Sequence, residues 1–240
     1  MTSAERPKVF GIGLNKTGTK TLARYLRQLG YRHRSYDSNN VYESPSFDLF
    51  AAEDTEGLLC IADEFDSAED WPWPLLYKEL DDRYPTAKFV LTVRSSAERW
   101  FRSLCNMAVR LGPLPLYEKA VYGYTMPQGH YEKLAEIYHR HEREVLAHFA
   151  GRPGKLLRIC WDDGAGEVER LAEFLGAQPG TLQPAHVNAS PRRVYEGDSL
   201  PIAHMNRIAY QQLYGPKSLP SRVAGKIRRL VATEGERSTP

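Results

Sequence analysis

The chain has 240 residues, enough for one domain of ordinary size or two small ones. Apolar residues make up 42% and charged residues 26%, a globular composition that excludes a wholly disordered chain, a collagen or a small disulfide-stapled protein. The 32 basic and 30 acidic residues leave a formal net charge of +2. This balance argues against bulk nucleic-acid binding, although it leaves room for a local basic site.

The cysteine content and the hydropathy pattern bear on the compartment. Cys60, Cys105 and Cys160 lie far apart and show no spacing typical of metal ligands or a redox pair. Such sparse cysteines favour a reducing compartment. The N-terminus is polar, without a signal-peptide pattern, and no apolar run approaches the roughly 20 residues of a membrane span. We therefore expect a soluble, cytoplasmic protein.

Strand and helix signals alternate along the first three quarters of the chain. In chain order we expect a buried strand at 8–13, a polar loop at 14–19, a helix at 20–30, an apolar run at 58–62, an acidic segment at 63–70, a break at 71–74, helical periodicity at 75–84, a strand at 88–93, a helix at about 97–111, an irregular aromatic segment at 112–129, a long helix at 130–150, a strand at 155–159 and a helix at 168–175.

This alternation predicts an α/β fold with a mainly parallel central sheet flanked by helices. Residues 178–200 are rich in Pro, Gly, Asn and Arg and are predicted to form a loop, with C-terminal helices at 202–214 and 222–231. We find no internal repeat, so we expect a single domain over 1–240, with its core at about 8–176 and a C-terminal helical extension.

The loop between the first strand and the first helix has the composition of an anion site. It reads Gly11-Ile-Gly-Leu-Asn-Lys-Thr-Gly-Thr19. A glycine-containing loop that leads into a helix directs several backbone N–H groups, and the positive end of the helix dipole, toward one point. Lys16 adds a mobile charge, and Thr17, Thr19 and Thr21 add hydroxyl donors. A polar turn without a ligand is the plainer alternative.

Two familiar phosphate-loop patterns fail here. Dinucleotide-binding folds need a third glycine at position 16, where this chain has lysine, and a Walker A loop places its lysine after the last glycine, whereas Lys16 precedes Gly18. Nucleoside-triphosphate hydrolases also end a later strand with an Asp that helps to hold Mg²⁺. Here the strand at 88–93 is followed by Arg94, which repels a metal ion and attracts an anion. We therefore expect no metal site.

The combination of motifs resembles the P-loop-type sulfotransferases that use 3′-phosphoadenosine 5′-phosphosulfate (PAPS). Lys16-Thr-Gly-Thr19 is similar to their 5′-phosphosulfate loop, and Thr92-Val-Arg94 with the later Trp100 and Ser103 is similar to their 3′-phosphate site. Residues 84–94 and 168–176 look like bacterial members that act on small molecules or glycans. The likeness covers most of residues 8–176.

The resemblance implies transfer of a sulfuryl group from PAPS to a hydroxyl or amine of a small-molecule or carbohydrate acceptor, leaving adenosine 3′,5′-bisphosphate. It implies no metal, and the charge balance predicts no nucleic-acid partner. Lys16 takes the electrostatic role at the departing phosphate. The residues expected to bind the cofactor are Asn15, Lys16, Thr17, Gly18, Thr19, Lys20, Thr21, Arg94, Ser103, Arg192 and Arg193.

Three features depart from the family pattern. The interval from Arg94 to Ser103 is one residue longer than is common in the family, and Ser95 or Ser96 either adds anion donors or caps the next helix. The Trp that many eukaryotic members place after the first loop is absent, and Leu22 stands near that position. Arg192 and Arg193 either return to the 3′-phosphate or form a solvated basic loop.

The resemblance also places Asp70 at the position of the family's general base, just before Trp71 and Pro72. Apolar neighbours such as Trp71 and Trp73 can raise the pKa of a carboxyl group to suit that task. Capping of the helix near Leu75, or simple solvation, is the alternative reading. Glu64 and Asp66 are weaker candidates in the same acidic run.

The remaining polar and aromatic residues carry weaker signals. His139 and His141 are placed on a surface helix, and His130 is a minor candidate base beside an aromatic loop. The tyrosines around 112–131 suit either a lid over the acceptor or the core, and we favour the core. Two other functions remain open: a P-loop kinase with an unusual loop, and a non-catalytic nucleotide-binding protein of the same fold.

Overall fold

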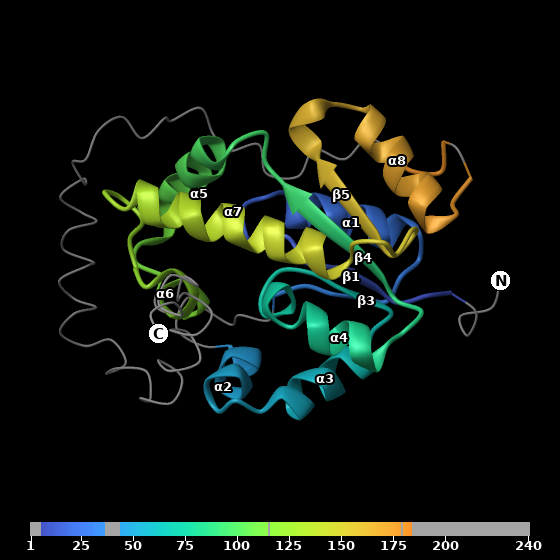
Figure 1. The fold of residues 1–240 in the computed structure, drawn as a ribbon, viewed down its shortest axis with the longest axis horizontal. Helices are drawn as coiled ribbons and strands as arrows, with labels where there is room; N and C mark the ends of the chain where they lie inside the picture. Colours follow the sequence, from blue (N-terminus) through green and yellow to red (C-terminus); the bar gives the residue numbers. More distant parts are fainter. Residues whose placement is uncertain (1–5, 37–43, 115, 179, 184–240) are drawn as a thin grey trace, which may run out of the picture.

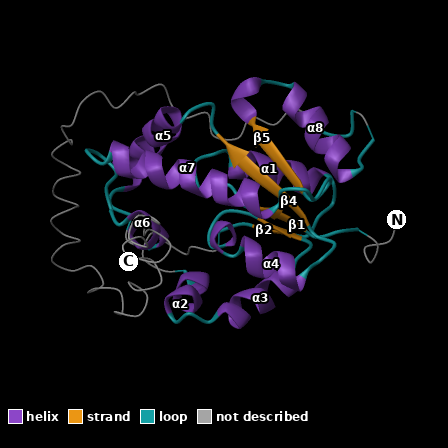
Figure 2. Ribbon diagram, viewed as in Figure 1, coloured by secondary structure: helices purple, strands orange, loops and turns teal. Residues whose placement is uncertain are grey.

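The structure is a computed structural model that describes residues 6–36, 44–114, 116–178 and 180–183. Five short strands form one sheet in the order β2–β3–β1–β4–β5, and every neighbouring pair is parallel (Figures 1 and 2). The strands are β1 (Val9–Gly11), β2 (His33–Arg34), β3 (Ser67–Ala68), β4 (Lys88–Val93) and β5 (Leu156–Cys160). The α/β class with a parallel sheet is therefore confirmed.

Helices connect the strands and cover both faces of the sheet. They are α1 (Thr19–Gln28), α2 (Pro45–Ala51), α3 (Thr55–Asp63), α4 (Tyr77–Arg83), α5 (Ala97–Leu111), α6 (Tyr117–Tyr122), α7 (Tyr131–His148) and α8 (Gly166–Leu175), with single 3₁₀ turns at Trp73–Leu75 and Trp161–Asp163. None of the described helices is long and apolar enough to cross a membrane.

Alternation along the strands divides the core into two layers. Val9, Val90 and Ile159 pack with α1 and α8 on one face of the sheet, and Phe10 and Phe89 pack with the helices of the other face. Figure 1 shows α7 lying across that second face, with α5 beyond the tip of β4 beside one end of α7, and with α2, α3 and α4 on the other side of α7. The sheet is thus the middle layer of three.

The connections that follow β1 and β4 diverge, and we call the region beyond the carboxyl ends of these two strands the crevice. The chain leaves β1 toward α1 on one face and leaves the neighbouring strand β4 toward α5 on the other face. Beyond the carboxyl ends of two such strands the connections diverge, and ligands of open α/β sheets bind at this point. The loop after β1 and the turn after β4 therefore face the same space.

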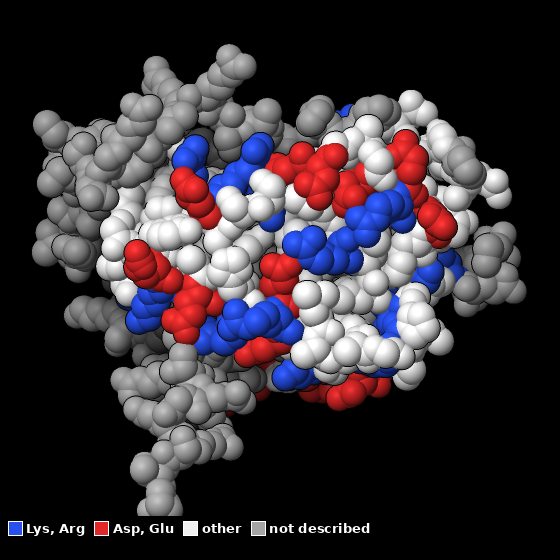
Figure 3. All heavy atoms as spheres, turned by 45° about the horizontal axis from the view of Figure 1, so that its top comes forward, with Lys and Arg blue, Asp and Glu red and all other residues white. Residues whose placement is uncertain are grey.

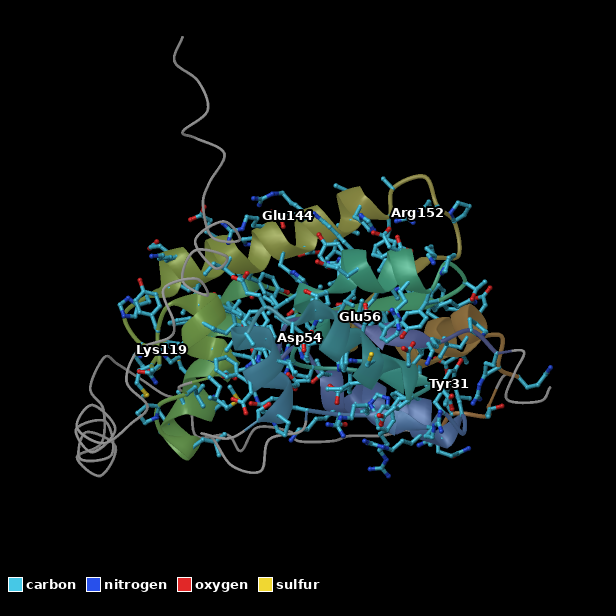
Figure 4. The ribbon with its side chains drawn as sticks, turned by 90° about the horizontal axis from the view of Figure 1, so that it is seen from below. Tyr31, Asp54, Glu56, Lys119, Glu144 and Arg152 are labelled. Carbon is cyan, nitrogen blue, oxygen red and sulfur yellow. The ribbon has the colours of Figure 1, made fainter. Side chains whose placement is uncertain are left out.

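A structural ion cluster lies at the start of β5, at the end of the sheet opposite the crevice. The buried carboxylate of Asp81 in α4 accepts hydrogen bonds from Arg152 (2.6 Å) and His148 (2.9 Å) and pairs with Lys155 (3.0 Å), just before β5. Figure 4 shows Arg152 beyond the end of α7, at the far end of the molecule from Lys119 of α6. This cluster joins α4, α7 and β5 on the side away from the crevice.

Basic and acidic side chains are interspersed over the face seen in Figure 3, as the near-zero net charge leads one to expect. An exposed cluster of ion pairs joins α3 to the end of α4. In it, Arg83 of α4 pairs with Asp63 at 2.5 Å and with Glu56 at 2.9 Å, both in α3. Exposed pairs of this kind contribute little to the free energy of unfolding, about 0–1 kcal/mol each.

The structure confirms the three longer strands and most of the predicted helices, and it corrects one expectation: the segment at 112–129 that we expected to be irregular contains α6. The apolar run at 58–62, to which the sequence assigned no element, lies inside α3. The two-residue strands β2 and β3 were not predicted. Most of the loop expected at 178–200 lies outside the described residues, as do the two expected C-terminal helices, Arg192 and Arg193.

Candidate functional site

The loop after β1 is packed so closely that its glycines cannot be replaced without displacing neighbours. A Cβ on Gly13 would lie 2.1 Å from the hydroxyl oxygen of Thr92 in β4. A Cβ on Gly18 would lie 2.3 Å from Cδ1 of Trp161, and the φ of Gly18, +99°, is one that side chains rarely adopt. Lys16 also has a positive φ of 68°. The loop is therefore tightly curved between β4 and the turn after β5.

Several polar groups of the loop are used to hold its own shape. The Thr17 hydroxyl lies 2.6 Å from both the Leu14 carbonyl oxygen and the Thr92 hydroxyl. The Asn15 side chain donates to Glu118 (2.8 Å) and accepts from the Tyr122 hydroxyl (2.7 Å). These two side chains were predicted to bind the cofactor, but the structure turns both of them inward. Any contact that they make with a ligand is left to their backbone groups.

The end of the loop presents unpaired donors at the start of α1. Gly18 is the N-cap residue of α1, and it brings no side-chain cap. In the part of the chain that the structure describes, no acceptor is bonded to the backbone N–H groups of Gly18, Thr19 and Lys20. A helix N-terminus with free N–H groups and its dipole attracts an anion. Thr21 follows with its N–H bonded to the Gly18 carbonyl oxygen at 3.0 Å.

Arg94, at the carboxyl end of β4, joins this loop to the turn after β5. Its Nε donates to the Lys16 carbonyl oxygen at 2.9 Å, and its Nη1 donates to Asp162 at 2.9 Å. The backbone N–H of Arg94 donates to the Tyr138 hydroxyl of α7. Sequence reasoning placed Arg94 at the crevice but missed Asp162, because 68 residues separate the two in sequence.

Asp70 lies directly against the loop. It follows β3, the neighbour of β1 in the sheet, and has a positive φ of 67°, a conformation that Asp adopts more readily than most residues. One carboxylate oxygen accepts from the Thr19 hydroxyl at 3.3 Å, and the other accepts from the Trp71 N–H at 2.9 Å. The predicted base and the predicted anion loop are therefore in contact.

The surroundings of Asp70 oppose its ionisation. Burial, followed by the nearby charge of Glu69, raises the pKa of Asp70 to about 7, although the Trp71 N–H acts in the other direction. Burial also raises the pKa of Glu118, which lies on the other side of Asn15. A carboxyl group with a pKa near neutrality can accept a proton at physiological pH and release it again.

Ser103 has a hydroxyl without a partner among the described residues, whereas the position of His141 corrects a sequence expectation. Ser103 is buried in α5, and its hydroxyl has no partner among the described residues. Helical spacing puts it one turn beyond Arg99, on the same face of α5. His141 was placed on a surface helix, but its Nε2 lies 2.7 Å from the Ile12 carbonyl oxygen, so it supports the loop. Burial lowers its pKa.

The other sequence candidates are less well placed. Glu64 is exposed at the end of α3, and Asp66 accepts from the backbone of Arg32 at 3.0 Å. The His130 ring stacks on Tyr124 with 3.5 Å between centroids. Tyr117 and Tyr122 are buried in the core, as we favoured, whereas Tyr124 is half-buried and Tyr131 is exposed. In the described segments, no three His, Cys, Asp or Glu side chains are grouped in a way that could hold a metal ion.

A family model described as a sulfotransferase domain matches residues 8–192. No curated protein sequence matches the chain. Among solved structures, the chain is similar to a sulfotransferase from Alicyclobacillus acidocaldarius, with 17% identity, 94% of this chain and 96% of that chain covered, and a TM-score of 0.49.

Proposed function

The chain belongs to the sulfotransferase domain family, and on that premise we propose that it transfers the sulfuryl group of PAPS to a hydroxyl or amine of a small-molecule or glycan acceptor. One observation carries the proposal: the free N–H groups at the start of α1 and the Asp70 carboxylate meet at Thr19. An anion-binding end and a proton acceptor thus adjoin in one crevice, as transfer between an anionic donor and a hydroxyl requires.

The residues of the loop fit the 5′-phosphosulfate end of such a donor. The N–H groups of Gly18, Thr19 and Lys20 supply unpaired donors, and the absence of a side chain at Gly18 lets the backbone itself approach the ligand. Lys16 and Lys20 bring positive charge to the same segment. Backbone donors held by a rigid loop need little reorganisation when an anion arrives.

We propose that the groups that flank the turn after β4 bind the second phosphate. Arg94 is half-buried there, and the unpartnered hydroxyl of Ser103 lies farther along α5. Arg192 and Arg193 remain proposals from sequence alone. These contacts govern the affinity for the donor, because they are remote from the bond that breaks. Loss of Arg94 is therefore expected to raise the donor KM more than it lowers kcat.

The bound donor supplies an activated sulfuryl group, and the bisphosphate is its leaving group. The chain's own contribution is positioning and electrostatics. Lys16 and the N–H groups of Gly18 and Thr19 stabilise the negative charge that grows on the departing phosphate oxygen. Asp70 accepts the proton of the acceptor hydroxyl, and the Thr19 hydroxyl bonded to it fixes the orientation of its carboxylate.

A direct test follows sulfuryl transfer itself. Purified protein is incubated with PAPS and a panel of phenols, alcohols, amines and oligosaccharides, and products are detected by the mass gain of one SO₃ group. We expect a product with the wild type in the presence of a metal chelator, and a strongly reduced rate with Asp70→Asn. Glu64→Gln, which removes an exposed carboxylate from the same acidic run, is the matched control and retains the wild-type rate. Equal rates for the two variants would exclude Asp70 as the base.

A further inference from the structure

The carboxylate of Asp162 occupies a complete set of anion donors. It accepts from the Arg94 guanidinium at 2.9 Å, from the Ser95 N–H at 3.1 Å and from the Ser95 hydroxyl at 3.2 Å. The Arg99 guanidinium lies 3.2 Å from the same carboxylate. Although burial acts in the opposite direction, these donors and charges hold the pKa of Asp162 below its usual value. The side chain is only 8% exposed.

These donors are the ones that an external anion would use. Ser95 and Ser96 lie just before α5, where the helix dipole adds positive potential, and two arginines flank the turn. Arg94 also reaches the loop after β1 through its bond to the Lys16 carbonyl oxygen. A phosphate that approaches Arg94 from the crevice therefore meets the negative charge of Asp162 already in place.

Asp162 is not needed to keep Arg94 at the crevice. The Lys16 carbonyl oxygen holds Nε of Arg94, and the Tyr138 hydroxyl accepts from the backbone N–H of Arg94 and donates to its carbonyl oxygen. The guanidinium of Arg94 is thus held at Nε, and Tyr138 holds both the N–H and the carbonyl oxygen of the Arg94 backbone. What Asp162 adds is a negative charge bonded to the remaining donors.

We propose that Asp162 is an affinity-determining residue: its carboxylate satisfies the donors of Arg94, Ser95 and Arg99 when no ligand is bound, and the second phosphate of the donor displaces it. The inference rests on the proposed function, since it concerns the bisphosphate end of that donor. A binding site whose competent state is only partly populated shows an affinity reduced by that fraction. Like charges that remain close across a contact reduce the affinity further.

The test compares two ligands by calorimetry on the full chain. Asp162→Asn removes the charge with little change of shape, and Asp163→Asn removes the neighbouring charge, which touches none of the three donors, as the matched control. Adenosine 3′,5′-bisphosphate carries the second phosphate and adenosine 5′-phosphate lacks it. We expect Asp162→Asn to bind the bisphosphate about tenfold tighter or more than the wild type does. Neither its affinity for the monophosphate nor the affinities of the control should change.

The possible results separate the two proposals. If the wild type binds the bisphosphate and Asp162→Asn binds it equally or more weakly, Asp162 supports Arg94 instead and only this inference fails. If neither protein binds the bisphosphate better than the monophosphate, the donor proposal fails and this inference falls with it. If Asp162→Asn bound both ligands more tightly by the same factor, this inference would also be refuted, because such an increase in affinity would reflect the change in net charge alone.

A second measurement does not depend on the variant. In a crystal structure of the wild type with the bisphosphate, we expect the second phosphate on Arg94 and Ser95. The separation between Nη1 of Arg94 and Oδ1 of Asp162, 2.9 Å in the free protein, should exceed hydrogen-bond distance. A phosphate bound at Arg94 with that pair still intact would overturn the displacement.

Discussion

Asp70→Asn should make the protein more stable and less active at the same time. Burial and the nearby Glu69 raise the pKa of Asp70 from 3.8 to about 7 in the folded state. The folded state therefore binds the proton of the Asp70 carboxyl group more tightly than the unfolded state does. The resulting stability is fully present below pH 3.8, and it is lost as the pH rises toward 7. At pH 8 the wild type carries the whole cost of the buried charge.

The size of this cost follows from the pKa shift. A change from 3.8 to about 7 corresponds to about 4 kcal/mol if it is converted at about 1.4 kcal/mol per unit. Asp70 is only half-buried, so water screens part of its charge, and we expect about half of that free energy, about 2 kcal/mol. For a chain of this length this amounts to a rise in Tm of about 4–8 °C at pH 8.

Thermal unfolding across pH is the assay for the stability effect. Asp70→Asn should melt above the wild type at pH 8, and the difference should shrink as the pH is lowered toward 4. Asp82→Asn, an exposed carboxylate on α4, is the control and should shift the free energy of unfolding by no more than about 0.5 kcal/mol. The same Asp70 substitution should lower kcat about 10²–10⁴-fold. A variant that melts below the wild type at pH 8, or that keeps its activity, would refute the reasoning.

Three further substitutions test the loop and its partner, and a fourth, Gly30→Ala, serves as a control. Gly18→Ala should destabilise the fold by about 2–5 kcal/mol, because a left-handed residue would press on Trp161, whereas Gly30→Ala, with a similar φ and open space around it, should cost only about 1–2 kcal/mol in chemical denaturation. Lys16→Ala should lower kcat at least about a hundredfold in single-turnover kinetics, with a smaller change in donor affinity. Arg94→Ala should weaken binding of adenosine 3′,5′-bisphosphate more than that of adenosine 5′-phosphate in calorimetric titrations; equal losses would place Arg94 away from the second phosphate.

Local patterns in the sequence were enough to predict the central strands and the helices around them. The apolar runs at β1, β4 and β5 and the regular spacing in α5 and α7 are signals that need no tertiary information. The strands β2 and β3 are only two residues long, so no periodicity can be read from them. The run at 58–62 shows the opposite difficulty, because five consecutive apolar residues suit a buried strand or a helix equally well.

The candidate site was predictable only where its residues are close in sequence. The loop composition identified Lys16, Gly18 and Thr19 together, and the end of the strand at 88–93 identified Arg94. Asp70 was placed only by the resemblance to the family. The partners that determine their chemistry come from distant segments. Glu118 lies 103 residues after Asn15, and Asp162 lies 68 residues after Arg94. No local sequence pattern around an acidic residue after β5 indicates an arginine partner. The pairing of Asp162 with Arg94 can therefore be recognised only in the folded sheet.

The central claim is that the crevice between β1 and β4 binds a sulfuryl donor with two phosphate positions and without a metal ion. Calorimetric titration of the wild type with adenosine 3′,5′-bisphosphate in the presence of a chelator tests it most directly, compared with a separate titration with ATP plus Mg²⁺ without chelator. We predict metal-independent binding of the bisphosphate that Lys16→Ala and Arg94→Ala both weaken. Binding of ATP only in the presence of Mg²⁺, with no affinity for the bisphosphate, would contradict the claim and favour a phosphate-transferring enzyme.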